Sequence, residues 1–318
     1  MVTAGHGWHP RHRQPANEVS ASNDTVPHMA IRRVLLSGLD RLNATTAVLQ
    51  RARLVHPLYG MWEGAEVQWS WGRPRATDDL PLPVWYDEVG PAAAVGLTSA
   101  RDTCQVDVFT VPSIVDEEVV WMETLAAAAK HGFENLEFLV GGENSPMATL
   151  ALRSGFTMTD ELSGTAWMDA DRRPPVGIID GFSVVDRRTR PDGPHPMIPR
   201  NGAMVEQRLQ QCSLYDAALD LAVEDADGTV AGYALYWFDP MTLVGLLEPM
   251  RVEDTFQRRG LARMLLTHGL DRLARKGARR LKVGFETEAA RNLYVGAGFV
   301  QTSVDRRLVR SAQDDPVD

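Results

Sequence analysis

Apolar and polar positions along the second half of the chain follow two periods, one typical of strands and one typical of helices. Alternating or continuous apolar runs predict four strands, at 181–187, 219–223, 229–237 and 243–252. Residues 225–228 lie between two of these runs and predict a tight hairpin, because Gly228 can adopt the positive φ that such turns need. Leucines at helical spacing from Leu261 to Leu273 predict an amphipathic helix that ends at Gly277.

The remaining segments of the second half complete a regular alternation of strands and helices. Helical spacing predicts a helix over 203–214, after a proline-rich loop at 191–199. Further along, we predict a strand at 280–285, a helix at 288–295 and two short strands around Val300 and Leu308. The order of strand, helix, three strands, helix, strand, helix and strands indicates an α+β fold with a mixed sheet.

The first half of the chain ends with the same order of elements. A helix at 119–130, a strand at 136–140 and a helix at 146–153 precede Gly155-Phe156, which stands where Gly298-Phe299 stands in the second half. Three strands expected upstream match the three-stranded meander of the second half, at 82–86, 92–98 and 104–111. The same order at a nearly constant offset predicts an internal duplication.

A proline-containing segment divides the two halves. The prolines of Asp171-Arg172-Arg173-Pro174-Pro175 remove backbone donors and interrupt any regular element, so we place the domain boundary there. The predicted domains are 30–172 and 173–311, with a flexible tail at 312–318.

Residues 1–29 lack the apolar stretch of a secretory signal and are expected to form a disordered tail, with Met29 an alternative start of translation. His6, His9 and His12 in this tail recur every three residues, but a flexible polar tail is a poor metal site.

Composition excludes several classes of protein. Of 318 residues, 44% are hydrophobic and 24% charged, and no apolar run is long enough to cross a bilayer, so we expect a soluble protein. Cys104 and Cys212 are far apart and have no Cys or His companions, which argues against a disulfide framework or a zinc site and favours the cytoplasm.

Charge is unevenly distributed along the chain. The formal net charge is −9, yet 257–310 contains 13 Lys and Arg against 4 Asp and Glu. A basic patch of this kind also suits nucleic acid, but the acidic remainder would repel a polyanion and no DNA-binding motif accompanies the patch. A small polyphosphate ligand is therefore favoured, and nucleic acid is not an expected partner.

A glycine-containing basic turn lies at the start of this patch. The hexapeptide Gln257-Arg258-Arg259-Gly260-Leu261-Ala262 connects a strand to an amphipathic helix, so the unpaired N–H groups of the first helical turn face an incoming anion. Gly260 and Ala262 leave room for a phosphate, and Arg258, Arg259 and Arg263 add positive charge. The string predicts a phosphate cradle, although by itself it also fits an ordinary helix N-terminus.

A second motif follows at the expected distance: Ala290-x-x-Leu293-Tyr294-x-x-x-Gly298-Phe299. With both motifs in order, residues 181–310 resemble the GNAT family of N-acetyltransferases. The resemblance implies an acyl-CoA N-acyltransferase fold in which the first motif holds the pyrophosphate of acetyl-CoA, and it implies that Tyr294 is the acid that meets the thiolate. Packing of the helix against the sheet is the alternative role for Tyr294. Where the family often has asparagine the chain has Thr287, which can still cap the helix.

Glu248 lies in an otherwise apolar strand. A carboxylate there is costly to bury unless it is used or paired, so we expect Glu248 to be the general base or to pair with an arginine. Pro249 cannot donate a ladder hydrogen bond and predicts a bulge. The family resemblance implies that this opening admits the pantetheine arm, with contacts from the segment Met250-Arg251-Val252, chiefly from the backbone of Met250 and Val252.

The first half lacks these chemical groups. Ile114-Val115-Asp116-Glu117-Glu118 stands where the cradle belongs and would repel a pyrophosphate, and Ala151 stands where the tyrosine belongs. We therefore expect a degenerate copy that retains the fold and has lost the cofactor. Four tryptophans, Trp62, Trp69, Trp71 and Trp85, suggest core packing, with Trp69 and Trp71 on one face of a strand, or an aromatic wall of the acceptor pocket between the domains.

The sequence thus predicts an N-acetyltransferase that is catalytic only in its second half. Its co-substrate would be acetyl-CoA, no metal is expected, and its acceptor would be a primary amine of a small molecule. The alternative is a non-enzymatic acyl-CoA-binding sensor or regulatory scaffold, and nucleic-acid binding ranks third. Nothing in the sequence supports a particular oligomeric state.

Overall fold

A computed structural model describes residues 30–58, 60–142 and 145–311. The metal-ligand candidates His6, His9 and His12 and both predicted tails lie outside these residues. The first half contains six strands and four α-helices within the described ranges, and a short 3-10 helix η1 (Ala170–Arg172) follows them. In chain order they are β1 (Arg32–Leu36), α1 (Gly38–Val55), α2 (Gly64–Trp71), β2 (Leu82–Tyr86), β3 (Pro91–Ala100), β4 (Thr103–Thr110), α3 (Glu117–Lys130), β5 (Leu136–Gly141), α4 (Pro146–Arg153) and β6 (Thr157–Asp169).

The second half repeats this order with shorter helices at its start. Its elements are β7 (Phe182–Asp186), α5 (Ile198–Asn201), α6 (Val205–Leu209), β8 (Asp220–Asp225), β9 (Val230–Asp239), β10 (Val244–Val252), η2 (Asp254–Phe256), α7 (Leu261–Lys276), β11 (Arg280–Phe285), α8 (Glu288–Gly296) and β12 (Val300–Arg310). The strand and helix pattern predicted for 219–295 is confirmed. Gly277 ends α7 in the left-handed conformation, at φ 104°, as predicted.

One sheet contains all twelve strands of the described residues, in the order β1-β2-β3-β4-β5-β12-β6-β11-β10-β9-β8-β7. From either edge the strands of each half follow one another to the centre, and the parallel pair β4 and β5 corresponds to the parallel pair β10 and β11. This correspondence confirms the predicted mixed fold and the duplication.

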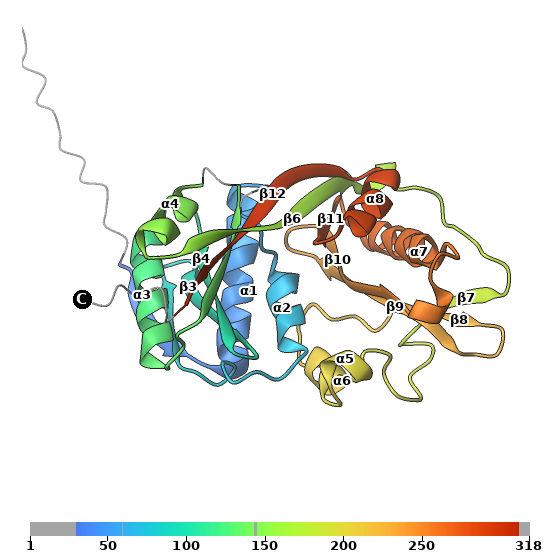
Figure 1. Ribbon diagram of the computed structural model, residues 1–318, viewed down its shortest axis with the longest axis horizontal. Coiled ribbons are helices and arrows are strands. Elements are labelled where there is room, and N and C mark those ends of the chain that lie inside the picture. Colours follow the sequence, from blue (N-terminus) through green and yellow to red (C-terminus); the bar gives the residue numbers. More distant parts are fainter. Residues whose placement is uncertain (1–29, 59, 143–144, 312–318) are drawn as a thin grey trace, which may run out of the picture.

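The closing strands of the two halves are exchanged. Strand β6 of the first half pairs with β11, and β12 of the second half pairs with β5, while β6 and β12 pair with each other at the centre. Figure 1 shows these two long strands crossing between the halves. The prediction of two short strands around Val300 and Leu308 is wrong, because β12 is one strand with two irregularities in its register to β6. The boundary at 171–175 remains a prediction.

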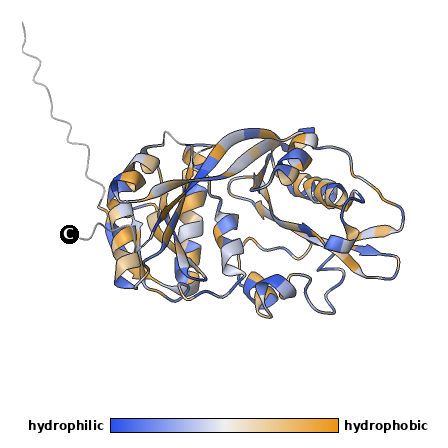
Figure 2. Cartoon of the chain, viewed as in Figure 1, coloured by the Kyte–Doolittle hydropathy of each residue, from blue (hydrophilic) through white to orange (hydrophobic). Residues whose placement is uncertain are grey.

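Helices cover both faces of the sheet. In β3, Ala94 packs against α1 while its neighbours Ala93 and Val95 pack against α3, as alternation along a strand requires. In β9, Tyr236 packs against α7, while Tyr233 and Trp237 face the opposite side. Strands β3 and β9 are accordingly buried along most of their length, while the helices carry both hydrophilic and hydrophobic residues (Figure 2).

Helix α2 of the first half packs on β9 and β10 of the second half. Trp69 and Trp71 belong to this helix, so the prediction that they share one face of a strand is wrong. A capping box at Glu63 and Glu66 starts the helix. The proline-rich loop and the helix predicted before 214 are also corrected: two short helices, α5 and α6, occupy this segment.

The segment between η1 and β7 lies along α7. The Gly177 N–H donates to Thr267 Oγ1 at 2.9 Å, and Arg173 pairs with Asp271 at 3.1 Å. Further on, Ile179 approaches the start of α7, so the connection between the halves reaches the predicted phosphate cradle.

Candidate functional site

A gap opens between β10 and β11. The two strands pair in parallel only as far as Leu247 and Val283, and β10 then continues beside β9 alone, with an irregular register between Leu247 and Met250. The bulge predicted at Pro249 is thereby confirmed. The Trp237 indole N–H donates to the Glu248 carbonyl at 2.8 Å and holds this irregular segment.

Backbone donors point into the gap. The Glu253 N–H donates to Ala231 O on β9 at 2.9 Å, so alternation turns the N–H groups of Val252 and Met250 away from β9 and toward the gap. The same alternation turns the Arg251 backbone toward β9, and its side chain pairs with Asp254 at 2.9 Å. The structure therefore directs the backbone N–H groups of Met250 and Val252 into the gap and that of Arg251 toward β9, and their contacts with a pantetheine arm stay a prediction.

The basic turn stands at the end of this gap. Gly260 is the N-cap of α7 with φ 84°, and no side chain caps the helix. The N–H groups of Leu261, Ala262 and Arg263 in the first helical turn are therefore left for an external acceptor. A Cβ on Gly260 would lie 3.1 Å from Ile179 Cδ1, so backbone conformation and packing also favour glycine here.

The side chains of the basic turn mostly bind neighbouring carbonyls. Gln257 Nε2 donates to Asp254 Oδ1 at 3.0 Å, Arg259 donates to Thr255 O at 3.2 Å, and Arg263 donates to Gly296 O at 3.2 Å. Arg258 is exposed and has φ 63°. An anion at this turn would therefore meet the backbone N–H donors at the start of α7, and the arginine side chains around them add positive charge.

Glu248 and Tyr294 approach the gap from β10 and α8. Glu248 is half-buried, and loss of water around its carboxyl, together with the negative charge of Glu66, raises its pKa to about 8. Tyr294 is buried, and burial together with the charge of Glu248 raises its pKa to about 12. Its ring packs edge-on to Phe299 with centroids 6.0 Å apart, so the packing role foreseen for Tyr294 is also present. No arginine pairs with Glu248 among the described residues.

Helix α8 begins at Glu288 with Thr287 as its N-cap. Thr287 Oγ1 accepts a hydrogen bond from the Ala290 N–H at 3.2 Å, which confirms the expected cap. The cap fixes the first turn of the helix that carries Tyr294.

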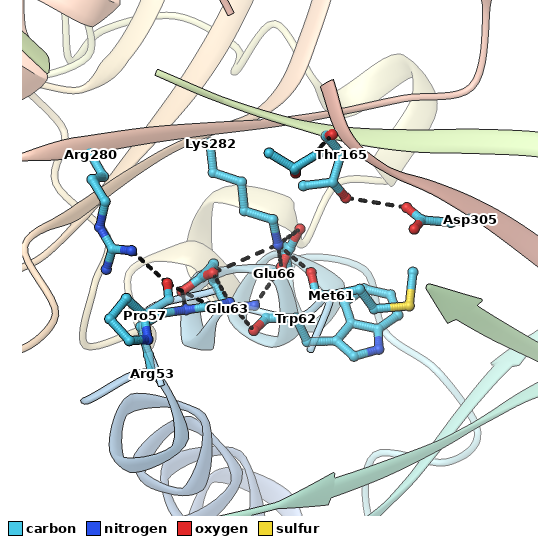
Figure 3. A network of polar contacts seen from close by, with 11 residues as sticks. Arg53, Pro57, Met61, Trp62, Glu63, Glu66, Thr165, Arg280, Lys282 and Asp305 are labelled. Carbon is cyan, nitrogen blue, oxygen red and sulfur yellow. Dashed lines mark hydrogen bonds and ion pairs between the residues drawn. The ribbon is translucent and has the colours of Figure 1, made fainter. Parts of the chain in front are cut away.

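A buried charged network beside Glu248 was missed by the sequence analysis (Figure 3). Lys282 of β11 has no exposed side-chain surface and pairs with Glu66 of α2 at 2.8 Å. Glu63 pairs with Arg53, and the Trp167 ring lies beside the cations of this network. Lys282 in an apolar strand is the same signal that identified Glu248, but its partner lies 216 positions earlier in the chain.

The first half carries no equivalent cradle in the described residues. The Asp116 side chain caps α3 by accepting from the Glu118 N–H at 2.8 Å, so a carboxylate of the protein occupies the place of an incoming anion. Ala151 is fully buried where the second half has Tyr294. The predicted loss of the cradle in this copy is consistent with both features.

Two cavities lie away from Glu248 and Tyr294. One of about 500 Å³ is lined by Trp62, by the ends of β4 and β5, and by Thr165, Trp167 and Asp305 on the exchanged strands. A smaller cavity of about 70 Å³ lies in the first half beside Trp62, Trp71 and the buried Asp107. Trp62 thus lines both cavities, of which only the larger is formed by elements of both halves, whereas Trp85 belongs to the core of the first half. An acceptor wall remains a prediction.

Other classes of site find no support in the described part of the chain. No cluster of three or more metal-ligating side chains occurs there. Cys104 and Cys212 are buried and unpaired, and burial raises the pKa of both thiols to about 12. No helix within the described ranges is long and apolar enough to span a membrane.

Comparison with known proteins gives a match for part of the second half. Residues 195–299 match the sequence model of the acetyltransferase (GNAT) family. A search of curated proteins gives no match.

Solved structures resemble the whole chain. A tandem GNAT protein from the clavulanic acid biosynthesis pathway has a TM-score of 0.64 and 16% identity, and the match covers 91% of this chain and 100% of that one. A GCN5-related N-acetyltransferase from Sphaerobacter thermophilus has a TM-score of 0.56 and 14% identity, covering 89% and 96%. At these identities the likeness shows the fold, a tandem arrangement that spans both halves.

Proposed function

We propose that the second half, whose residues 195–299 match the sequence model of the GNAT family, transfers an acetyl group from acetyl-CoA to a primary amine. The observation that carries the proposal is the uncapped start of α7 at the end of the gap between β10 and β11, close to Glu248 and Tyr294. Backbone N–H groups at a helix N-terminus suit a pyrophosphate, and the gap offers backbone donors to an amide-containing arm. The residues present therefore fit acetyl-CoA.

In the proposed reaction one side chain accepts a proton and another donates one. Glu248 accepts the proton that the amine loses as the nitrogen–carbon bond forms. Tyr294 donates its proton to the departing thiolate as the carbon–sulfur bond breaks, since its raised pKa keeps it protonated until then. The N–H groups directed into the gap stabilise the carbonyl oxygen while it carries negative charge.

A small acceptor is favoured over a protein tail. The face of the sheet beside Glu248 is covered by α2 of the first half, which packs on β9 and β10 and pairs with Lys282. This cover limits the acceptor to a molecule that fits between the two halves. We propose a small-molecule primary amine on this ground.

Cofactor binding is tested by matched substitutions of Gly260. Aspartate and asparagine have the same shape and both tolerate a left-handed conformation, so Gly260→Asp and Gly260→Asn differ chiefly in charge. Saturating CoA should raise the melting temperature of the wild type, because a ligand that binds only the folded state stabilises it. The increase should disappear in Gly260→Asp and be partly retained in Gly260→Asn. Equal loss in both variants would attribute the effect to backbone geometry, and no increase in the wild type would refute the cradle.

Turnover distinguishes the enzyme from the alternative sensor or scaffold. Free CoA should be released from acetyl-CoA in a panel of small primary amines, and Tyr294→Phe should slow this release by about 100-fold while preserving the thermal shift with CoA. Binding of CoA without release in any amine would favour the sensor.

A further inference from the structure

Lys282 brings a charge into the centre of the molecule. Its side chain has no exposed surface, and its ammonium lies 2.8 and 3.0 Å from the two carboxylate oxygens of Glu66 and also donates to Met61 O. Lys282 belongs to β11 of the second half, whereas Glu66 and Met61 belong to the first half (Figure 3). A buried ammonium is tolerated only with such partners, because its desolvation alone costs several kcal/mol.

The network around this pair contains further charged groups. Glu63 pairs with Arg53, whose Nε lies 3.2 Å from Glu63 Oε2, and Glu63 Oε1 lies 3.8 Å from Lys282 Nζ. Three cations gather around the Trp167 ring, with Arg53 at 5.2 Å, Lys282 at 6.0 Å and Arg280 at 5.4 Å from its centroid. Glu63 and Glu66 are the carboxylates that lie among these cations.

Strand register and helix packing place the pair next to the segment that carries Glu248. Lys282 of β11 is in register with Leu246, two residues before Glu248, and α2, which carries Glu66, packs on β10. Three charged groups act on the Glu248 carboxyl, namely Glu66, Lys282 and Glu286 after β11, and Glu248 in turn acts on the neutral Tyr294 of α8. After loss of water, the largest influence on the pKa of Glu248 is Glu66, which raises it, and Lys282 opposes this effect. A residue of the first half thus bears directly on the proposed base of the second.

We propose that Glu66 is a positioning residue of the second half's active site, acting together with Lys282 to control when Glu248 is ionised. The inference rests on the proposed function, since it assigns Glu248 the role of base. The first half, without a cradle of its own, is then part of the catalytic apparatus. The pair of Glu66 and Lys282 lies on the face of the sheet that α2 covers. Packing of α2 on this face and ionisation of Glu248 therefore depend on each other.

The two members of the pair should act in opposite directions. Replacement of Glu66 by glutamine removes a repulsive anion and leaves Lys282 to attract Glu248, so the pKa of Glu248 falls. Replacement of Lys282 by methionine removes the attractive cation, so the pKa rises. Glutamine also serves in a capping box, so Glu66→Gln retains the start of α2.

The dependence of kcat/KM on pH tests the inference. We expect activity to rise with pH through the pKa of Glu248, with the midpoint shifted down by about one pH unit in Glu66→Gln and up by a similar amount in Lys282→Met. The double variant should return toward the wild-type midpoint. Glu206→Gln is the matched control, because it breaks a paired carboxylate, bound by Arg187 at 2.7 and 2.9 Å, that does not act on Glu248. Midpoints that coincide in all variants would overturn the inference.

A second measurement does not depend on catalysis. Carbon-13 carboxyl signals of labelled glutamate can be titrated, with the Glu248 signal assigned by its loss in Glu248→Gln. The Glu248 midpoint should move down in Glu66→Gln and up in Lys282→Met. An unmoved midpoint would refute the pair even in an active enzyme, whereas the expected shift without CoA release would retain the pair and refute the proposed function. Should Lys282→Met fail to fold, the Glu66→Gln and double variants decide.

Discussion

Gly269 lies in the middle of α7 directly above the ring of Tyr236. A Cβ placed on Gly269 would lie 2.0 Å from Tyr236 Cζ and 2.2 Å from both Cε atoms, whereas carbon atoms in contact are about 3.5–4.0 Å apart. The ring is fully buried, and its hydroxyl donates to Leu265 O at 2.8 Å, one turn earlier in the same helix. Gly269→Ala must therefore move either the ring or the helix by more than about 1 Å.

Two effects of opposite sign decide the outcome of Gly269→Ala. Alanine in a helix interior is favoured over glycine by about 1 kcal/mol. Overpacking a tight core costs typically about 1–3 kcal/mol, and the overlap here is with a rigid ring held by a hydrogen bond, which puts the cost at the upper end. The net destabilisation should be about 2 kcal/mol, which corresponds to a fall in melting temperature of about 4 °C for a protein of this size.

Scanning calorimetry of Gly269→Ala beside Gly296→Ala provides the assay. Gly296 is exposed at the end of α8, and a Cβ added there would have no atom within 4 Å, so its replacement should leave the melting temperature unchanged or slightly raised. The thermal shift with CoA should also shrink in Gly269→Ala, because displacement of α7 moves the cradle at its N-terminus. A melting temperature of Gly269→Ala at or above that of the wild type would refute the reasoning.

Two further outcomes follow from other residues. Burial raises the pKa of Asp107 to about 7 from an ordinary 3.8, so the folded state keeps a proton that the unfolded state has lost, and stability falls as pH rises through this window. Asp107→Asn should therefore exceed the wild type in stability at pH 8 by up to about 4 kcal/mol and lose this advantage near pH 4, as measured by urea unfolding; equal curves at both pH values would contradict the shift. Thr287→Ala removes the cap of α8 and should cost about 1 kcal/mol, with Thr287→Ser as the control that retains the cap; an unchanged urea midpoint in Thr287→Ala would count against it.

The elements that could be predicted from the sequence are those with a regular pattern of apolar residues over a long segment. The leucines of α7 repeat at one period over sixteen residues, and Gly260 and Gly277 mark its ends, so that helix followed from the sequence. Helix α2 has eight residues in which Trp69 and Trp71 also satisfy the alternation of a strand. The capping box of Glu63 and Glu66 is the local signal for a helix here, and α2 also packs on α1, β9 and β10, which the sequence pattern does not reveal.

The features that could not be predicted from the sequence depend on contacts between distant parts of the chain. The sequence analysis predicts two short strands around Val300 and Leu308, and the charged run Asp305-Arg306-Arg307 lies between them in the single strand β12. In the structure Asp305 accepts from Thr165 and Ser303, and Arg307 pairs with Glu137 and Glu161 of the first half. The same holds for the candidate site: Glu248 and Tyr294 were recognisable from local motifs, whereas Lys282 and Glu66 are informative only once the two halves are in contact.

The exchange of closing strands makes the order of synthesis relevant to folding. Strand β5 pairs with β12, and the ion pair of Glu137 and Arg307 between these strands joins residues 170 positions apart in the chain. While the ribosome is still producing the second half, the inner edge of the first half's sheet has no partner of its own, and an unpaired strand edge invites aggregation. The sheet of the first half is therefore completed only after β12 of the second half has been synthesised. The two halves reach the native state together, as one folding unit.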